Sequence, residues 1–436
     1  MSSEHIFFEI AYALSHKRLC LFTGAGFTKS ITNNTAPSWK ELLEKVCDNN
    51  EIDPKPILEE EALSLEEKAQ LIKIILDNKN ISLSSEISDI IRKIELSEEN
   101  TNEVCKFFRE NKFRVITTNY DKLSEMLVSE DTKIQSLSPG LPIPKSTSHI
   151  KFYHIHGSID FPEGMVVTSE DYFKFINSDS YFSRKLYTVL HEGFIIILGY
   201  SLSDVNLKAI LNEYKGYASQ SHLSSNIVLV SRNTVSQNTK DYYISCFGIR
   251  VIDCMEINDF FKKMNEKKSD VHKMRDRSIN NIDKVINNHE RRFEFKESYL
   301  RKENSFFEIM ASLFAIGIDI KDTKVIELLK VIITKKIDLT SENNAWEQYH
   351  HLALWLSYIA SIFDLQESPL KEVFLKGVKI SLTNYREKMV LGSSWRASTE
   401  WKASWGNIMP INRKIIKEYV KENIPNSDAK KLVGLS

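Results

Sequence analysis

Four short stretches of this 436-residue chain combine residue types that could bind a phosphorylated ligand and transfer a proton. They are Gly24-Ala25-Gly26 in LFTGAGFTKS, Asn119 and Asp121 in TTNYD, His156-Gly157 in HIHGS, and Gly199 to Asp204 in GYSLSD. Each stretch follows an apolar segment typical of a buried strand. Ligands of open α/β sheets bind outside the carboxyl ends of the strands. The four stretches are therefore expected to gather at one edge of a sheet and to form one site.

The glycine turn does not meet either of the common nucleotide-binding patterns. A phosphate loop requires GxxxxGK[ST], and here Lys29-Ser30 follows Thr28 instead of a glycine. The dinucleotide pattern GxGxxG is matched by Gly24 and Gly26, but Lys29 occupies the third glycine position. Small residues between a strand and a helix still let the backbone approach a pyrophosphate. A purely structural turn is the alternative interpretation.

The other three stretches also have structural interpretations when each is taken alone. Asn119 or Asp121 could cap the helix expected to begin at Asp121. His154 and His156 alternate along a strand and so face opposite sides, which leaves one of them free to be a structural histidine. Glycines often end strands. The occurrence of all four stretches in this order favours a functional site.

The elements that must position these residues alternate between strands and helices. Strands are expected at 18–24, 113–119, 151–157, 165–168, 193–199, 226–231 and 249–253, and helices at 4–16, 39–48, from 121, at 169–192, near 204 and between the last two strands. Residues 57–111 have helical spacing and are expected to form an insertion of three to five helices. The pattern predicts an α/β fold with a doubly wound, mainly parallel sheet.

Composition excludes several other classes of protein. The net charge is −1, and no apolar run is long enough to span a membrane. The amino-terminal MSSEHIFFEI does not have the pattern of a secretory signal. The five cysteines are irregularly spaced and form no CxxC pair, which favours reduced thiols and a cytoplasmic location and argues against a cysteine-based zinc site.

The carboxyl-terminal part is predicted to be helical. Residues 261–300 mix acidic and basic side chains, which favours a solvated helical connector over a nucleic-acid surface. Residues 301–436 repeat helical apolar spacing and are interpreted as a regulatory or assembly domain. Residues 393–407 hold three tryptophans, which could belong to a core or to a contact surface.

The order of the four stretches resembles the sirtuin-like superfamily of NAD-consuming proteins. Gly24-Ala25-Gly26 matches the GAG turn of that family, Thr118 to Asp121 resembles its TQNxD element, and His156-Gly157 matches its catalytic His-Gly. Gly199 and Ser201 resemble its late GxS loop, in a form closer to bacterial sirtuin-like domains. The resemblance covers roughly residues 5–255 and implies a Rossmann-like sheet within a domain at residues 1–260.

Two departures from the family's protein deacylases bear on activity. Deacylases carry a zinc module with two CxxC pairs after the catalytic histidine, and this chain has no cysteine between His156 and Gly199. The GAG turn is followed by Phe27-Thr28, where deacylases usually have Ile-Ser. The resemblance therefore implies hydrolysis of NAD+ to nicotinamide and ADP-ribose, without zinc, as in bacterial antiviral members of the superfamily.

The resemblance also implies a role for each site residue. Asn119 and His156 would be catalytic, His156 as the base because histidine titrates near neutral pH, and Asp121 would lie near the nicotinamide amide or fix the Asn119 loop. The further NAD-binding residues would be Thr23, Gly24, Ala25, Gly26 and Thr28 at the pyrophosphate side, and Gly199, Ser201 and Asp204 at the adenosine side.

Other functions remain open at the level of the sequence. The same site could bind NAD or ADP-ribose as a sensor or assembly subunit without turnover, and a protein deacylase or ADP-ribosyltransferase is a third possibility. An NAD-destroying enzyme must be controlled, so a homo-oligomer or a partner such as a HerA-type ATPase in phage defence is expected by analogy. No nucleic-acid contact is expected from the sirtuin-like domain.

Overall fold

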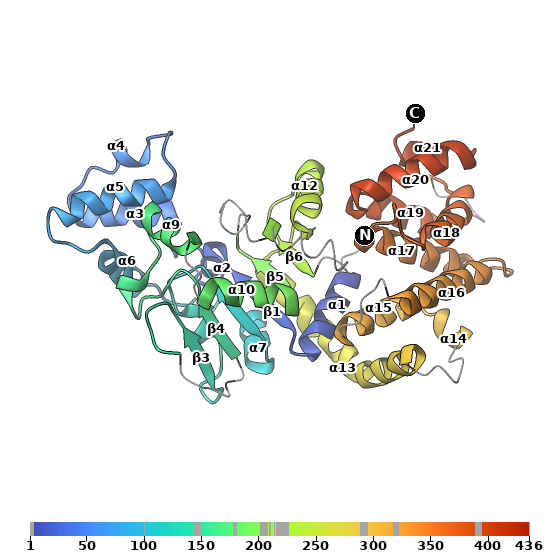
Figure 1. Cartoon of the computed structure of the whole chain (residues 1–436), viewed down its shortest axis with the longest axis horizontal. Coiled ribbons are helices and arrows are strands. Elements are labelled where there is room, and N and C mark those ends of the chain that lie inside the picture. Colours follow the sequence, from blue (N-terminus) through green and yellow to red (C-terminus); the bar gives the residue numbers. More distant parts are fainter. Residues whose placement is uncertain are drawn as a thin grey trace.

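The computed structural model describes residues 4–99, 101–143, 148, 150–177, 181–200, 208, 211, 212, 214, 226–287, 295–316, 322–388 and 395–435. Figure 1 shows a central sheet with a group of helices at one end and a larger helical half at the other. The expected combination of an α/β fold with a helical insertion and a helical carboxyl-terminal part is confirmed.

The central sheet has seven strands in the order β3-β4-β2-β1-β5-β6-β7, and all six neighbouring pairs are parallel. Their bounds are β1 Leu19–Thr23, β2 Arg114–Thr117, β3 Ile134–Leu137, β4 Ile150–His154, β5 Phe194–Leu198, β6 Ile227–Val230 and β7 Ile249–Ile252. The strands β1, β5 and β6 are buried along their whole length, and this explains why their sequences are nearly continuous apolar runs.

Alternate residues of each strand contribute to two separate apolar cores, one on each face of the sheet, as a doubly wound sheet requires. Leu21 of β1 and Ile196 of β5 belong to the core beneath α1 (Glu4–Ser15) and α13 (Ile257–Asn287). Phe22 and Ile197 point to the opposite core, which also contains residues of α10 (Tyr181–Glu192) and α12 (Gln237–Phe247). Helices therefore cover both faces and leave the strand ends available for a site.

The chain changes direction across the sheet between β1 and β5. From β1 it continues to β2 and β4 on one side, and then crosses to β5 on the other side of β1. This topological switch point is where ligands of doubly wound sheets bind. The two glycine-containing turns predicted for the site follow β1 and β5, so the topology brings both to this point.

The expected insertion is a compact helical lobe. It contains α4 Lys55–Leu58, α5 Leu65–Asp77, α6 Leu83–Ile91 and α7 Asn102–Glu110, preceded by α3 Trp39–Asn49. Ser38 and Ser64 begin α3 and α5 with capping boxes completed by Glu41 and Glu67. Helices α3 to α6 share an apolar core of their own, whereas Phe107 and Phe108 of α7 join the core beneath the sheet.

Two expectations about the strands were wrong. Residues 165–168 are not a strand, because Val166 donates its N–H to the carbonyl of His156 and lies against the loop beyond β4. The edge strand β3 was missed, because its four residues include the polar Gln135 and Ser136 and give little apolar signal. The single helix expected at 169–192 is divided into α9 (Ser169–Asn177) and α10. The helix expected near residue 204 lies outside the described residues.

The helical half packs directly against the α/β half. Its described helices are α14 Glu297–Leu300, α15 Ser305–Ile316, α16 Thr323–Leu339, α17 Trp346–Ile362, α18 Lys371–Thr383, α19 Trp395–Ser404, α20 Pro410–Asn423 and α21 Ser427–Leu432. One continuous apolar core includes residues of α1, the sheet and α15 to α20. The domain division near residue 260 stays a prediction, since α13 runs through it from Ile257 to Asn287.

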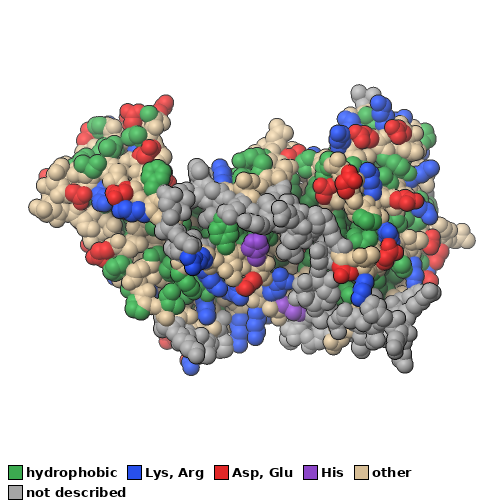
Figure 2. All heavy atoms as spheres, in the orientation of Figure 1, with side chains coloured by type: hydrophobic (Ala, Val, Ile, Leu, Met, Phe, Trp, Pro, Cys, Tyr) green, Lys and Arg blue, Asp and Glu red, His purple; other side chains and the backbone are tan. Residues whose placement is uncertain are grey.

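Surface features of the helical half match an ordinary packed protein. Figure 2 shows acidic and basic side chains interspersed over this half on the face in view. Trp401 is fully buried while Trp395 is exposed, so the tryptophan segment contributes both to the core and to the surface. Among the residues described, no helix combines the length and apolar character that crossing a membrane requires.

Candidate active site at the carboxyl edge of the sheet

The register of the strands aligns the four predicted stretches. Thr23 of β1 pairs with Thr117 of β2 and with Leu198 of β5, and Thr117 pairs with His154 of β4. Asn119 and His156 each lie two residues beyond a member of the Thr117–His154 pair. The sheet thus places both candidate catalytic residues at the same edge, just beyond the neighbouring strands β2 and β4.

The glycine turn meets the end of β5 at the switch point. Gly24 donates its N–H to the carbonyl of Leu198 at 3.1 Å, and Gly26 donates to the carbonyl of Gly199 at 2.9 Å. Gly199 has a positive φ of 62°, and a Cβ atom there would lie 1.9 Å from the backbone nitrogen of Phe27. Glycine is thus required at 199 for the close approach of the two turns.

Asn119 is attached by its side chain to the glycine turn. Its Nδ2 donates to the carbonyl oxygen of Gly24 at 2.9 Å and to Oγ1 of Thr28 at 2.8 Å. A carbonyl oxygen can only accept, so this contact determines which end of the amide faces the turn. With both Nδ2 hydrogens donated, the remaining polar atom of the side chain is the acceptor Oδ1.

Thr28 links Asn119 to Asp121. The Thr28 hydroxyl, on α2 (Ala25–Ile31), accepts from Asn119 and donates to Oδ2 of Asp121 at 2.8 Å. Oδ1 of Asp121 accepts the N–H of Leu123 at 3.1 Å, at the start of α8 (Leu123–Met126). Burial raises the pKa of Asp121, while the bonds from Thr28 and Leu123 act in the opposite direction. Asp121 thereby holds the TNYD loop against the glycine turn.

A second buried pair lies beneath the same loop. Nε2 of His154 lies 2.8 Å from Oε1 of Glu125, and its Nδ1 lies 3.1 Å from the carbonyl oxygen of Asn119. Burial alone would lower the pKa of His154, but the Glu125 carboxylate, the Asn119 carbonyl and Asp121 together raise it above its ordinary value. His154 is thus the histidine of the HIHGS stretch that contacts the Asn119 loop.

His156 has a different, aromatic environment. Its ring makes edge contacts with Tyr172 and Phe175 of α9, at centroid distances of 5.2 and 5.3 Å. Gly157 follows with a φ of +89°, and a Cβ atom there would meet the backbone of Met165 at 2.7 Å. The close return of the chain past Gly157 therefore places α9 against the His156 ring.

The remaining predicted residues are placed as follows. Thr23 is fully buried at the end of β1, and its Oγ1 has no hydrogen-bond partner in the described part of the chain. Ala25 begins α2 beside Gly24. Ser201 and Asp204 lie outside the described residues. The assignment of these residues to parts of NAD stays a prediction.

The sequence reasoning did not single out Glu125 and left His154 as one of two possible structural histidines. A local signal for Glu125 was available: it stands four residues after Asp121, in the segment that the sequence predicts as a helix. No comparable local signal connects Glu125 with His154, since 29 residues separate them in the chain.

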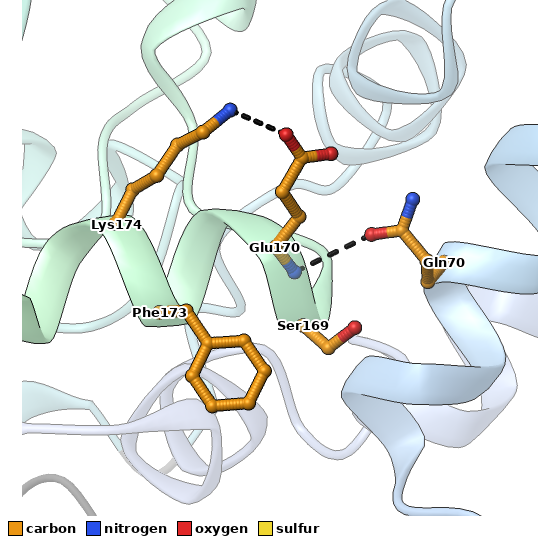
Figure 3. A pocket seen from close by; sticks show the side chains of 5 residues that line it. All are labelled: Gln70, Ser169, Glu170, Phe173 and Lys174. Atoms are coloured by element: carbon orange, nitrogen blue, oxygen red, sulfur yellow. Dashed lines mark hydrogen bonds and ion pairs between the residues drawn. The ribbon is translucent and has the colours of Figure 1, made fainter.

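A surface hollow of about 520 Å³ lies on the other side of α9. Figure 3 shows Gln70 of α5 reaching to the backbone nitrogen of Glu170, with Lys174 paired to the Glu170 carboxylate. Phe173 lines the same hollow and is 65% exposed. Helix α9 thus contacts the insertion on one face and the ring of His156 on another. Outside this edge, one group of described side chains could hold a metal ion, namely Glu303, His350 and His351 of the helical half.

Comparison with known proteins agrees with this geometry. Residues 114–252, from β2 to β7, match the family model of the SIR2-like domain. The chain is 24% identical over 258 residues to "Defense-associated sirtuin 2" of Bacillus subtilis. The aligned region covers 58% of this chain and 24% of that protein. It is 27% identical over 207 residues to "NAD(+) hydrolase ThsA" of Bacillus cereus (strain MSX-D12), covering 45% of this chain and 39% of the relative.

A second "NAD(+) hydrolase ThsA", from Cytobacillus dafuensis, is 25% identical over 213 residues, or 48% of this chain and 40% of the relative. The chain thus spans less than half the length of the curated relatives it matches. The parallel doubly wound sheet, the order of the four stretches at its edge and these matches agree: residues 114–252 match a SIR2-like domain, and the chain is similar to bacterial sirtuin-like proteins.

Proposed function

We propose that the protein is an NAD+ glycohydrolase that cleaves NAD+ to nicotinamide and ADP-ribose. The observation that carries this proposal is the fixed orientation of Asn119, whose amide is held by Gly24 and Thr28 while Oδ1 remains as an acceptor. Asn119 follows β2, the strand next to the one that precedes His156, and an acceptor there, beside the switch point, suits a ribose hydroxyl or an attacking water. The relatives named as NAD(+) hydrolases support the same substrate.

In the proposed reaction the bond between C1′ of the ribose and the ring nitrogen of nicotinamide breaks. Nicotinamide leaves with the bonding electron pair and becomes neutral, so it needs no proton from an acid. Water supplies the oxygen that bonds to C1′, and its proton passes to His156, directly or through a ribose hydroxyl. Asn119 Oδ1 orients the hydroxyl or the water, and the low-dielectric surroundings of His156 strengthen these polar interactions.

The biological setting proposed for this activity is bacterial antiphage defence by depletion of NAD+. It is supported by the name of the relative called a defense-associated sirtuin. Because uncontrolled NAD+ cleavage would harm the cell, we propose that self-assembly or a partner such as a HerA-type ATPase controls the activity. The helical half is the part of the chain that we propose makes such contacts.

The proposal is tested by measuring nicotinamide and ADP-ribose released by the full-length protein, alone and with the product of a neighbouring gene. Asn119→Ala and His156→Ala are each expected to lower the rate by about 10² to 10⁴-fold. His350→Ala, in the helical half, is the matched histidine control and should leave the rate unchanged.

Each other outcome selects a different function. Tight NAD+ binding without cleavage in any assembly would favour a sensor or assembly subunit. Transfer of label from NAD+ to protein, or turnover of an acyl-lysine peptide, would favour the third class of function. Full activity in both site variants would reject the assignment of Asn119 and His156.

A further inference from the structure

His154 and Glu125 form a buried polar pair directly under the loop that carries Asn119. The side chains of His154 and Glu125 are only 1% and 6% exposed. The pair joins three elements, since His154 ends β4, Glu125 belongs to α8, and the Asn119 carbonyl lies in the loop between β2 and α8. Burying two titratable groups is costly unless they are paired with each other and hydrogen-bonded.

The contacts of the ring indicate that it carries two protons. The Asn119 carbonyl accepts from Nδ1, because a carbonyl oxygen cannot donate. Oε1 of Glu125 faces Nε2 and also accepts from the Ser136 hydroxyl of β3 at 3.0 Å. Two acceptors opposite two ring nitrogens are satisfied by an imidazolium ion paired with a carboxylate. Asp121 is the other charged group that acts on the ring, and it too favours the positive form.

The second oxygen of Glu125 makes the pair unusual. Oε2 is buried and has no hydrogen-bond partner among the described residues. A buried carboxylate oxygen without a donor costs free energy, so a purely structural role would be better filled by an apolar side chain or a fully bonded one. The carboxylate gains its stabilisation from the charge of His154, and the two residues therefore act as a unit.

The contact with His154 means that the backbone N–H, the backbone carbonyl and the side chain of Asn119 are all hydrogen-bonded. The Asn119 N–H donates to Oγ1 of Thr117 at 3.0 Å, the carbonyl accepts from His154, and the side chain donates to Gly24 and Thr28. Without the contact to the carbonyl, the peptide after Asn119 could rotate and displace Oδ1.

We propose that His154 and Glu125 are positioning residues that hold the backbone of Asn119 so that its Oδ1 stays directed at the ribose. This inference rests on the NAD+ cleavage proposed above, and it assigns no direct contact with substrate to either residue. It also separates the two histidines of the HIHGS stretch: His156 accepts a proton during the reaction, and His154 must keep its protons throughout.

Because His156 must be neutral and His154 must stay protonated, the rate should depend on pH at both ends of the range. His156 must be neutral to act as a base, so its protonation limits the rate at low pH. Loss of a proton from His154 leaves a bare ring nitrogen facing an acceptor oxygen, which repels it and releases the loop. Activity should therefore also fall at high pH, as the pH rises through the pKa of His154, which is raised above its ordinary value of about 6.5.

The test compares kcat and KM for NAD+ between about pH 6 and pH 10 in the full-length protein and three variants. His154→Gln removes the titrating group and keeps an amide donor. Glu125→Gln removes the negative charge and keeps an acceptor. His351→Gln is the control, because His351 is another buried histidine that contacts a backbone carbonyl, that of Arg301, in the helical half.

We expect His154→Gln to lower kcat by about 10²-fold while KM changes by less than about threefold, because misplacement of a catalytic group affects mainly the transition state. The fall in rate at high pH should disappear in this variant, while the fall at low pH remains. Glu125→Gln should move the high-pH fall to lower pH, since the carboxylate no longer favours the charged ring. His351→Gln should match the unmodified protein in both rate and pH profile.

The inference is overturned if the wild-type protein is active and His154→Gln has an unchanged kcat. It is also overturned if kcat of His154→Gln is lower but depends on pH in the same way as that of the wild-type protein. If His154→Gln does not fold, as judged by circular dichroism, Glu125→Gln decides: an unshifted high-pH fall rejects the inference. A wild-type protein that binds NAD+ but cleaves none in any assembly would reject the proposed function, and the positioning role with it.

Discussion

The Asn119 side-chain nitrogen lies 2.9 Å from the carbonyl oxygen of Gly24, a residue 95 positions earlier in the chain. The bond joins the loop after β2 to the turn after β1. Because the Gly24 carbonyl can only accept, it also fixes the direction of the Asn119 amide. The glycine turn thus has a role beyond any approach to a phosphate: its backbone orients the candidate catalytic amide.

Removal of the Thr28 hydroxyl should weaken this arrangement. Thr28→Val keeps the shape of the side chain but leaves the Asn119 amide without one acceptor and Asp121 without one donor. We expect the free energy of unfolding to fall by about 1–3 kcal/mol, and nicotinamide release to fall with it. Urea denaturation measures the first effect. Thr28→Ser keeps the hydroxyl and should restore most of both, whereas equal loss in the two variants would show that packing, not hydrogen bonding, matters at this position.

The contact between the two glycine turns should not tolerate a side chain. Gly199→Ala would place a Cβ atom 1.9 Å from the backbone nitrogen of Phe27 and would force alanine into a positive φ. We expect a loss of more than about 2 kcal/mol in unfolding free energy and a loss of NAD+ binding.

The matched control is Gly406→Ala, whose Cβ would meet the amide end of the flexible Gln237 side chain, which can move away. Thermal unfolding and calorimetric titration with NAD+ compare the two variants. A Gly199→Ala protein with normal stability and binding would contradict the tight approach of β1 and β5 at the switch point.

Two buried histidines should affect stability at opposite ends of the pH range. Burial, together with the nearby positive charges of Lys336 and His350, lowers the pKa of His351 to about 3. The unfolded chain takes up a proton at this residue below about pH 6.5, but the folded chain does not until about pH 3, so the contribution of His351 destabilises the fold as the pH falls through this window. His154 has a pKa that is raised in the folded protein. The stability that it contributes is therefore fully present below about pH 6.5 and is lost as the pH rises through the raised pKa.

Thermal midpoints measured from acidic to basic pH can separate these effects. The difference between the wild-type protein and His351→Gln should change on the acidic side, and the difference between the wild-type protein and His154→Gln on the basic side. A single common pH dependence for both variants would refute the assignment.

A buried ion pair within the α/β half is also hydrogen-bonded to the helical half. Arg250 of β7 donates to both carboxylate oxygens of Glu9 on α1, at 2.6 and 3.1 Å, and Tyr358 of α17 donates to the same carboxylate at 2.6 Å. Glu9→Gln alone leaves the Arg250 charge buried without its partner and should cost about 3–5 kcal/mol. Combining it with Arg250→Met should cost much less than the sum of the two single changes.

Urea denaturation of the two single variants and the double variant measures this coupling. Glu170→Gln breaks the solvent-exposed pair with Lys174 and should not change the midpoint. Additive losses at Glu9 and Arg250 would argue against a buried charge pair between α1 and β7.

The sequence alone predicted most of the elements and their order. Strands such as Phe194–Leu198 are short apolar runs that end in glycine, and such local patterns depend on burial and turn chemistry within a few residues. The edge strand β3 was missed and 165–168 was taken for a strand because the apolar signal at both places is weak or ambiguous. The resemblance to sirtuin-like proteins supplied the roles proposed for Asn119 and His156, which local chemistry could not assign.

Only the tertiary structure decided which side chains meet. Pairing of parallel strands is non-local, so the register that brings Asn119 over His154 follows from the whole sheet and not from any short segment. For the same reason, nothing near His154 in the chain indicates its partner Glu125, and nothing near Gly199 indicates that it touches Gly26. The sequence by itself determined that polar residues end the strands of a doubly wound sheet; packing across the switch point determined which of them hold the candidate catalytic amide in place.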